Sequence, residues 1–280
     1  MLHQQYTLNC KGKLLDLSQP IIMGILNITP DSFFDGGKYM SNTSILGKAT
    51  KMLEEGAQII DIGGMSSRPG ADFISVQEEL DRILPAVEII NKHYPETIIS
   101  IDTIRSAVAK QAVSSGACII NDISAGKFDD ELFQTVAQLK VPYILMHMQG
   151  QPKNMQTNPN YKDIALEVLD FMIEKVGQLR ALGVKDICID PGFGFGKSLQ
   201  HNYQLLKKMH IFKILELPIL CGLSRKSMIY KLLNTTPDKA LNGTSALHMI
   251  ALQEGAKILR VHDVREAFEV IQLWQNLEKV

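Results

Sequence analysis

Eight short apolar runs recur along this chain, and each ends in one polar or charged residue. These end residues are Asn27, Asp61, Asp102, Asn121, His147, Asp190, Ser224 and Arg260. Segments of helix length separate the runs, so strands alternate with helices and must pair in parallel through crossovers. Eight such units predict an α/β fold, a (β/α)8 TIM barrel. Residues just past the carboxyl ends of barrel strands gather on one face, so we expect these side chains to converge on one site.

Amphipathic periodicity places the helices between the strand runs. The expected helices span 42–56, 75–93, 104–115, 129–139, 161–182, 201–210, 225–234, 241–254 and 263–277. Two polar loops, 27–41 and 63–74, exceed the usual length of a βα connection, which is typical of binding loops that order around a ligand. Before the first run, YTLN and KLLDL flank a short turn and predict an N-terminal β-hairpin that covers the barrel floor.

Length and composition favour a single domain, residues 1–280, because the chain has about the size of one barrel. A net charge of −1 argues against nucleic acid or an anionic membrane as the main partner. No apolar run approaches the roughly 20 residues that span a bilayer, and the N-terminus lacks the apolar core of a leader. We therefore expect a cytoplasmic protein. Three of the four cysteines lie in strand runs, where a thiol acts as a small hydrophobe.

Three of the predicted strands end in hydrogen-bond acceptors: Asp102, Asn121 and Asp190. A heterocycle with several N–H donors on one edge needs such groups, and a carboxylate accepts two parallel donors in a charge-assisted arrangement. Each residue alone is as well explained as a helix cap or a turn former. Their expected meeting on one rim favours ligand binding.

Cationic groups also end several units. They are Arg68, Lys226, Arg260 and His262. Convergent Arg with His or Lys suits a phosphate, because the guanidinium fork matches its oxygens. A single surface Arg is usually only solvated. Arg260 and His262 alternate along one strand end, so both are expected to point the same way, which favours a functional role.

The stretch DPGFGFGKS, Asp190 to Ser198, satisfies neither the Walker A pattern nor G-x-G-x-x-G. Its glycines instead favour a loop that lets a flat ligand approach the backbone and Phe195. His147 lies between Met146 and Met148, and the pattern leaves open whether this histidine is catalytic or packs in the core.

The blocks MGILNITPDSF, DIGGMSSRPGA, SIDT, INDIS, LMHMQG, DPGFGFGKS, GLSRKSMI and LRVHDV resemble dihydropteroate synthase, in that family's order, from Leu15 to the last helix. The resemblance implies a transferase of folate biosynthesis that condenses 4-aminobenzoate with a dihydropterin methyl pyrophosphate, releasing pyrophosphate. It further implies Mg2+ as cofactor, a homodimer, and an SN1-like route through a pterin methylene cation.

The resemblance also implies roles for individual positions. The pterin subsite would comprise Asp102, Asn121, Ile123, Met146, Asp190 and Lys226. The pyrophosphate subsite would comprise Asn27, Arg68, Arg260 and His262, with Asn27 as the Mg2+ contact. The aminobenzoate subsite would comprise Phe33, Ser67, Pro69, Phe195, Lys226 and Ser227. Residues placed closest to the chemistry would be Asp102, Asp190, Lys226 and Arg260.

Three positions depart from the family pattern. Met65 replaces an acidic residue, Ser67 replaces a threonine, and Phe34 follows Phe33 where a small residue is commoner. Two other functions stay open: a pterin-dependent methyltransferase of corrinoid metabolism, and a non-catalytic paralogue that binds pterin. Arg68 and the SRKS block favour pyrophosphate chemistry over methyl transfer.

Overall fold

The computed structural model describes residues 6–29, 41–66, 70, 73–151 and 153–279. In this part of the chain, eight parallel strands close into a barrel in the order β10-β3-β4-β5-β6-β7-β8-β9. The strands are β3 Ile21–Asn27, β4 Ile59–Gly63, β5 Ile98–Asp102, β6 Ile119–Asp122, β7 Tyr143–Met146, β8 Ile187–Asp190, β9 Ile219–Cys221 and β10 Ala256–Val261. The predicted (β/α)8 barrel is confirmed.

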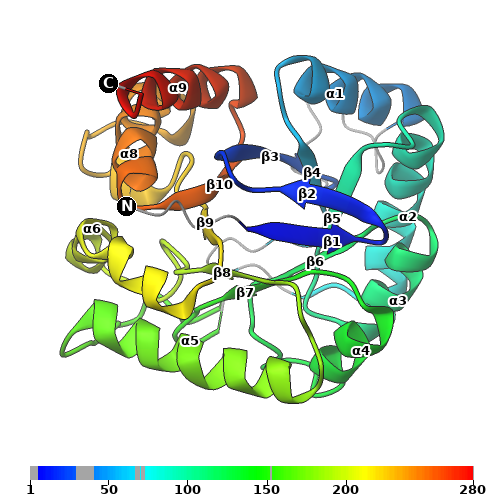
Figure 1. Ribbon diagram of the computed structural model, residues 1–280, viewed down its shortest axis with the longest axis horizontal. Coiled ribbons are helices and arrows are strands. Elements are labelled where there is room, and N and C mark those ends of the chain that lie inside the picture. Colours follow the sequence, from blue (N-terminus) through cyan, green and yellow to red (C-terminus); the bar gives the residue numbers. More distant parts are fainter. Residues whose placement is uncertain (1–5, 30–40, 67–69, 71–72, 152, 280) are drawn as a thin grey trace.

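Helices surround the barrel and follow the strands in turn (Figure 1). They are α1 Asn42–Glu54, α2 Val76–His93, α3 Ser106–Ser114, α4 Leu132–Leu139, α5 Ile164–Ala181, α6 Leu199–Lys207, α7 Ser227–Tyr230, α8 Leu241–Gln253 and α9 Val264–Leu277, with 3-10 segments at Met209–Leu215 and Pro237–Lys239. The helix expected over 225–234 is only the short α7. The chain beyond it forms turns, and Asn234 takes a left-handed conformation that a continuing helix does not allow.

Alternate residues of each strand face the barrel interior and the outer helices. In β4, Ile60 and Ile62 pack in the cluster that includes the helices, whereas Ile59 packs inside the barrel. Asp61 lies between Ile60 and Ile62, so the same alternation turns its carboxylate inward. A charged residue therefore enters the barrel interior, where its register partner on β5 is the buried Ser100.

An N-terminal hairpin covers one end of the barrel, as predicted. Strands β1 (Thr7–Cys10) and β2 (Lys13–Asp16) pair antiparallel, and both turn residues, Lys11 and Gly12, have positive φ, as a two-residue hairpin turn requires. Leu8 packs with barrel residues in one buried cluster. Figure 1 shows the hairpin lying across the barrel end.

Among the described residues, no helix is both long and apolar enough to cross a membrane. The four cysteines are free and buried, which agrees with their expected role as small apolar side chains.

The hairpin supplies a direct test of this packing. Leu8 is 2% exposed and Leu14, in the same hairpin, is 74% exposed. Leu8→Ala should lower the free energy of unfolding by about 3 kcal/mol, because it leaves a cavity at the barrel floor. Leu14→Ala should change it by less than about 0.5 kcal/mol. Urea unfolding followed by circular dichroism measures both, and equal losses would contradict the assigned packing.

Candidate active site

The parallel register brings the strand-end side chains to one level of the barrel. One row of register partners crosses β3 to β6: Asn27, Gly63, Asp102 and Asn121. On the next two strands, Met146 is the partner of Asp190. Residues separated by up to 163 positions in sequence therefore share one rim of the barrel, as the strand pattern predicted.

Arg260 reaches from β10 across the barrel mouth to carboxylates on β4 and β5. Its Nε lies 2.6 Å from Asp61 Oδ2, and its Nη2 lies 2.8 Å from Asp102 Oδ2. Asn121 Nδ2 donates to the same Asp61 oxygen at 3.0 Å. The resemblance places Asp102 and Arg260 in different subsites, yet the two side chains are in direct contact. The rim is thus one connected network of charges.

Asp61 is a site residue to which the sequence pattern assigns no role. The pattern ends its strand at Asp61, whereas β4 continues to Gly63, so Asp61 lies deeper in the barrel than expected. Its side chain is fully buried, and Oδ1 accepts no hydrogen bond from the described residues. The available signal was an acidic residue inside an apolar run, because a buried carboxylate needs a partner.

A glycine loop after β8 brings Asp190, Phe195 and Lys226 together. Asp190 Oδ1 accepts a hydrogen bond from Gly192 N at 2.7 Å. Lys226, which follows β9, donates through Nζ to the carbonyl oxygen of Phe193 and lies 4.5 Å from the centroid of the Phe195 ring. An ammonium at this distance is attracted to the ring face. The loop therefore connects the acceptor of one predicted subsite to the aromatic ring of another.

Helix capping does not explain the three acceptors. Ser41, Ser75, Asp163 and Ser198 are the side chains that cap described helices. Asp190 does close a turn through Gly192, so the turn-forming alternative holds for one of its oxygens. Asp102 and Asn121 contact the Arg260 and Asp61 side chains instead.

Burial and neighbouring charges oppose each other at this rim. Burial raises the pKa of Asp102 and of Asp190, while Arg260 and Lys226 respectively act to lower the pKa of each. Burial likewise lowers the pKa of Lys226 to about 8. Desolvation by the rim and the positive charges of Arg260 and Arg225 lower the pKa of His262. These shifts are typical of functional sites, where charges are held away from water.

His262 is oriented by Ser224, which lies in the chain that follows β9. Its Nδ1 lies 3.1 Å from Ser224 Oγ, and its backbone N–H donates to the same oxygen at 3.2 Å. The histidine thus contacts Ser224, while Arg260, two residues earlier, pairs with carboxylates inside the barrel.

An apolar cluster forms another wall beside Asp190. It comprises Ile104, Ile123, Met146, Met148 and Met155, with Met65, Phe128 and Phe195 against it. Ile123 and Met146 thus lie together with Phe195, and flat apolar surfaces of this kind suit a planar ring.

Comparison with known proteins decides the family. A family model described as pterin binding enzyme matches residues 23–262. The chain is 47% identical to the dihydropteroate synthase of Haemophilus influenzae over 96% of this chain and 98% of that protein. This chain belongs to the dihydropteroate synthase family. It is a transferase of folate biosynthesis.

Solved structures agree with this assignment. The dihydropteroate synthase of Yersinia pestis, in complex with a sulfonamide drug, has a TM-score of 0.93 at 43% identity and covers 98% of this chain and 100% of its own. The dihydropteroate synthase of Xanthomonas albilineans with 4-aminobenzoic acid has a TM-score of 0.92 at 39% identity, covering 99% of each chain.

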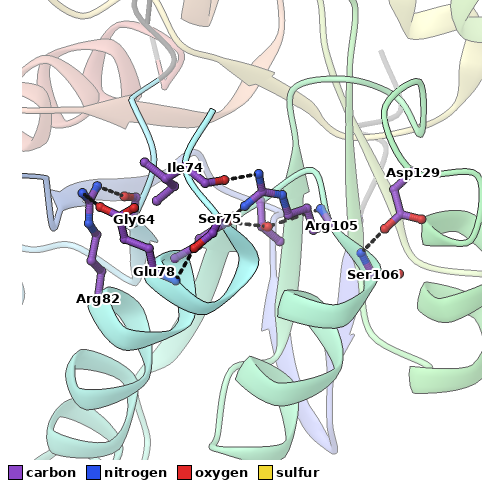
Figure 2. A network of polar contacts seen from close by, with 10 residues as sticks. Gly64, Ile74, Ser75, Glu78, Arg82, Arg105, Ser106 and Asp129 are labelled. Carbon is purple, nitrogen blue, oxygen red and sulfur yellow. Dashed lines mark hydrogen bonds and ion pairs between the residues drawn. The ribbon is translucent and has the colours of Figure 1, made fainter. Parts of the chain in front are cut away.

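In this synthase, two arginines hold the ends of the segment that follows β4 (Figure 2). Arg82, on α2, donates through Nη1 to the carbonyl oxygen of Gly64 at 2.8 Å and pairs with Glu78. Arg105 donates through Nη2 to the carbonyl oxygen of Ile74. Gly64, just after β4, and Ile74, just before α2, are therefore each held by an arginine side chain.

Arg105, which holds Ile74, is also linked to the pterin side of the rim. Arg105 Nη1 lies 2.7 Å from Glu79 Oε2, and Thr103, next to Asp102 in the chain, donates to Glu79 Oε1 at 2.6 Å. Because Glu79 is fully buried, it is well placed to hold Thr103 and Arg105 in a fixed relation.

Four predicted site residues, Phe33, Ser67, Arg68 and Pro69, lie outside the described residues, as does Phe34. Ser227 begins α7, directly after Lys226, and Asn27 ends β3.

The charge network at the barrel mouth should be essential to stability. Arg260→Met removes the cation shared by Asp61 and Asp102, and we expect the free energy of unfolding to fall by about 3 kcal/mol, since two buried carboxylates lose their partner. Arg265→Met is the matched control, because Arg265 pairs with Glu269 on the exposed face of α9 and should cost under about 0.5 kcal/mol. Urea unfolding compares the two, and similar small losses would show that the Arg260 pairs contribute little.

Proposed function

We propose that this enzyme condenses 4-aminobenzoate with 6-hydroxymethyl-7,8-dihydropterin pyrophosphate to give 7,8-dihydropteroate and pyrophosphate. The observation that carries the proposal is the meeting of buried carboxylates with Arg260 and Lys226 on one rim. A pterin offers several N–H donors, and its pyrophosphate is an anion, so a site for this substrate needs acceptors and cations close together.

Asp190, Asn121 and Lys226 would bind the edge of the pterin. Asp190 Oδ1 accepts a hydrogen bond from Gly192 N. Asp190 Oδ2 lies beside Gly222, since a Cβ on that glycine would lie 3.5 Å from this oxygen. Asn121 offers both an acceptor and a donor, and Lys226 offers donors only. Ile123 and Met146 would then cover a face of the bound ring.

The reaction would begin with cleavage of the bond between the pterin methylene carbon and the pyrophosphate oxygen. The electron pair leaves with pyrophosphate, and positive charge remains on the pterin methylene. Arg260 and His262 would stabilise the departing anion, while the carboxylates of Asp102 and Asp190 would stabilise the cation. The arylamine nitrogen then bonds to the methylene carbon and releases a proton. Arg260 and Asp102 are in contact, so a cation for the leaving pyrophosphate and a carboxylate for the pterin methylene cation would lie side by side.

Mg2+ fits this rim as an ion shared with the substrate. In the described part of the chain, no group of three His, Cys, Asp or Glu side chains is placed to hold a metal. Asn27 offers one amide oxygen, Oδ1. This oxygen lies beside Gly63, since a Cβ on that glycine would lie 3.3 Å from it. Mg2+ commonly takes few protein ligands and completes its shell with phosphate oxygens and water. When bound, it would neutralise charge on the leaving pyrophosphate.

Phe195, Lys226 and Ser227 would receive 4-aminobenzoate. The Phe195 ring offers an apolar face, and the adjacent ammonium of Lys226 attracts a carboxylate. Ser227 adds a hydroxyl at the start of α7. The roles of Phe33, Ser67 and Pro69 in this subsite, and of Arg68 in the pyrophosphate subsite, stay predictions from the resemblance.

Identity of 46–47% with dihydropteroate synthases over most of the chain favours the synthase over a corrinoid methyltransferase. Incubation of the purified protein with both substrates and Mg2+ separates the alternatives. The synthase forms dihydropteroate and pyrophosphate in equal amounts, whereas a methyltransferase or a non-catalytic pterin-binding paralogue forms neither.

Asp190→Asn tests the pterin subsite. Loss of charge-assisted hydrogen bonds should weaken binding of a pterin without pyrophosphate by about 2 kcal/mol or more, roughly 30-fold in Kd, measured by calorimetry. Asp186→Asn is the matched control, since Asp186 precedes the same strand at the hairpin end and accepts a hydrogen bond from Asn9 N. A change below about threefold for Asp190→Asn would remove this residue from the subsite.

We propose a homodimer that uses the C-terminal helices. Ile250 on α8 and Leu273 and Leu277 on α9 are exposed apolar side chains, and these helices pack on each other. Sedimentation velocity should give the mass of two chains, and a monomer at micromolar concentration would contradict this. The 1–280 single-domain assignment and the cytoplasmic location stay predictions.

A further inference from the structure

The glycine loop after β8 lies in unusually close contact with the chain that follows β7. A Cβ on Gly192 would lie 1.9 Å from the carbonyl oxygen of His147, and one on Gly196 would lie 2.3 Å from that of Gln149. Both glycines also have positive φ. Neither Gly192 nor Gly196 has room for a side chain. At these two residues the position of the loop therefore depends on the contacts of its backbone groups.

Lys197 supplies those contacts. This lysine is 2% exposed, and its Nζ lies 2.8 Å from the carbonyl oxygen of Gly192, 3.1 Å from that of Phe195 and 2.9 Å from His147 Nδ1. A fourth acceptor, the carbonyl oxygen of His147, lies farther away at 3.4 Å, so the three protons of an ammonium are directed at the three nearer acceptors. His147 must then accept at Nδ1, which assigns its proton to Nε2.

Lys197 and Asp190 contact the same glycine. Gly192 links the two, because its N–H donates to Asp190 Oδ1 and its carbonyl oxygen accepts from Lys197. Burial lowers the pKa of Lys197 well below its usual range, and Asp190 acts in the opposite direction. A buried lysine of this kind is costly and needs a reason.

Several groups share this environment. The charged or titratable groups that interact electrostatically with Asp190 are Lys226 after β9, Arg260 on β10, Lys197, and the thiols of Cys188 and Cys221. Those that interact with Lys197 are Asp190, Lys226 and His147. Lys226 lies at the rim and contacts the loop at Phe193, whereas Lys197 holds the loop from its buried side.

We propose that Lys197 is a positioning residue for the synthase reaction: its amino group sets the Gly192–Phe195 backbone, which carries the aminobenzoate ring contact and the N–H that donates to Asp190. This inference rests on the proposed roles of Asp190 and Phe195. It also answers the open question of His147, which acts as the acceptor for Lys197 rather than touching substrate.

Lys197→Met tests this role, because it keeps most of the side-chain volume and removes the amino group that donates to the loop carbonyls. We expect KM for 4-aminobenzoate to rise about tenfold, since the Phe195 backbone loses its anchor. We expect kcat at saturating 4-aminobenzoate to change much less than this KM, because a displaced ring contact weakens substrate binding rather than the chemical step. Lys207→Met removes an exposed lysine of α6 and should change neither quantity.

A purely structural lysine would lower protein yield or kcat without raising KM for 4-aminobenzoate. An unchanged KM for 4-aminobenzoate in a folded Lys197→Met variant would overturn the proposal. Asp190→Asn in parallel distinguishes this failure from failure of the proposed function: if it abolishes pterin binding while Lys197→Met behaves like Lys207→Met, only the role of Lys197 is wrong.

A pair of His147 variants covers the case in which Lys197→Met does not fold. Asn places an oxygen near the position of Nδ1 and can accept from Lys197, whereas Leu leaves one ammonium proton without a partner. His147→Leu should raise KM for aminobenzoate at least fivefold, and His147→Asn should recover most of that loss. Equal defects in the two variants would contradict a role that depends on acceptance from Lys197.

Discussion

The contact of Arg260 with Asp61 and Asp102 is the interaction on which the rest of the site depends. It joins β10 to β4 and β5 across the barrel mouth, at distances of 2.6 and 2.8 Å. Buried carboxylates without a cation would take up protons, and a buried guanidinium without carboxylates would be strongly destabilising. The same charges that stabilise the barrel mouth are therefore available to stabilise the ions formed from the substrate.

Two lysines extend this arrangement to the glycine loop. Lys226 reaches the loop from the rim and lies against Phe195, while Lys197 reaches it from the buried side. Asp190 lies within the influence of both. Carboxylates on β4, β5 and β8 thus have cations from β10 and from the chain after β9 near them.

Much of this architecture follows from the order of residues. Strand ends at Asn27, Asp102 and Asp190 are recognisable because an apolar run stops at a polar side chain. Asp61 is harder to interpret, because its strand continues two residues further and only the inward alternation shows where its carboxylate goes. The short α7 is likewise hidden, since helical periodicity does not reveal the turns that follow it.

By itself the sequence determined the alternation of strands and helices, the polar residues at the strand ends, and motifs long enough to indicate the family. Only the tertiary structure decided which of those residues touch: Arg260 meets Asp102 from 158 positions away, and Lys197 meets His147 from 50. The physical reason is that side-chain contacts across a barrel depend on register and on inward or outward direction. Both are properties of the closed sheet rather than of any one segment.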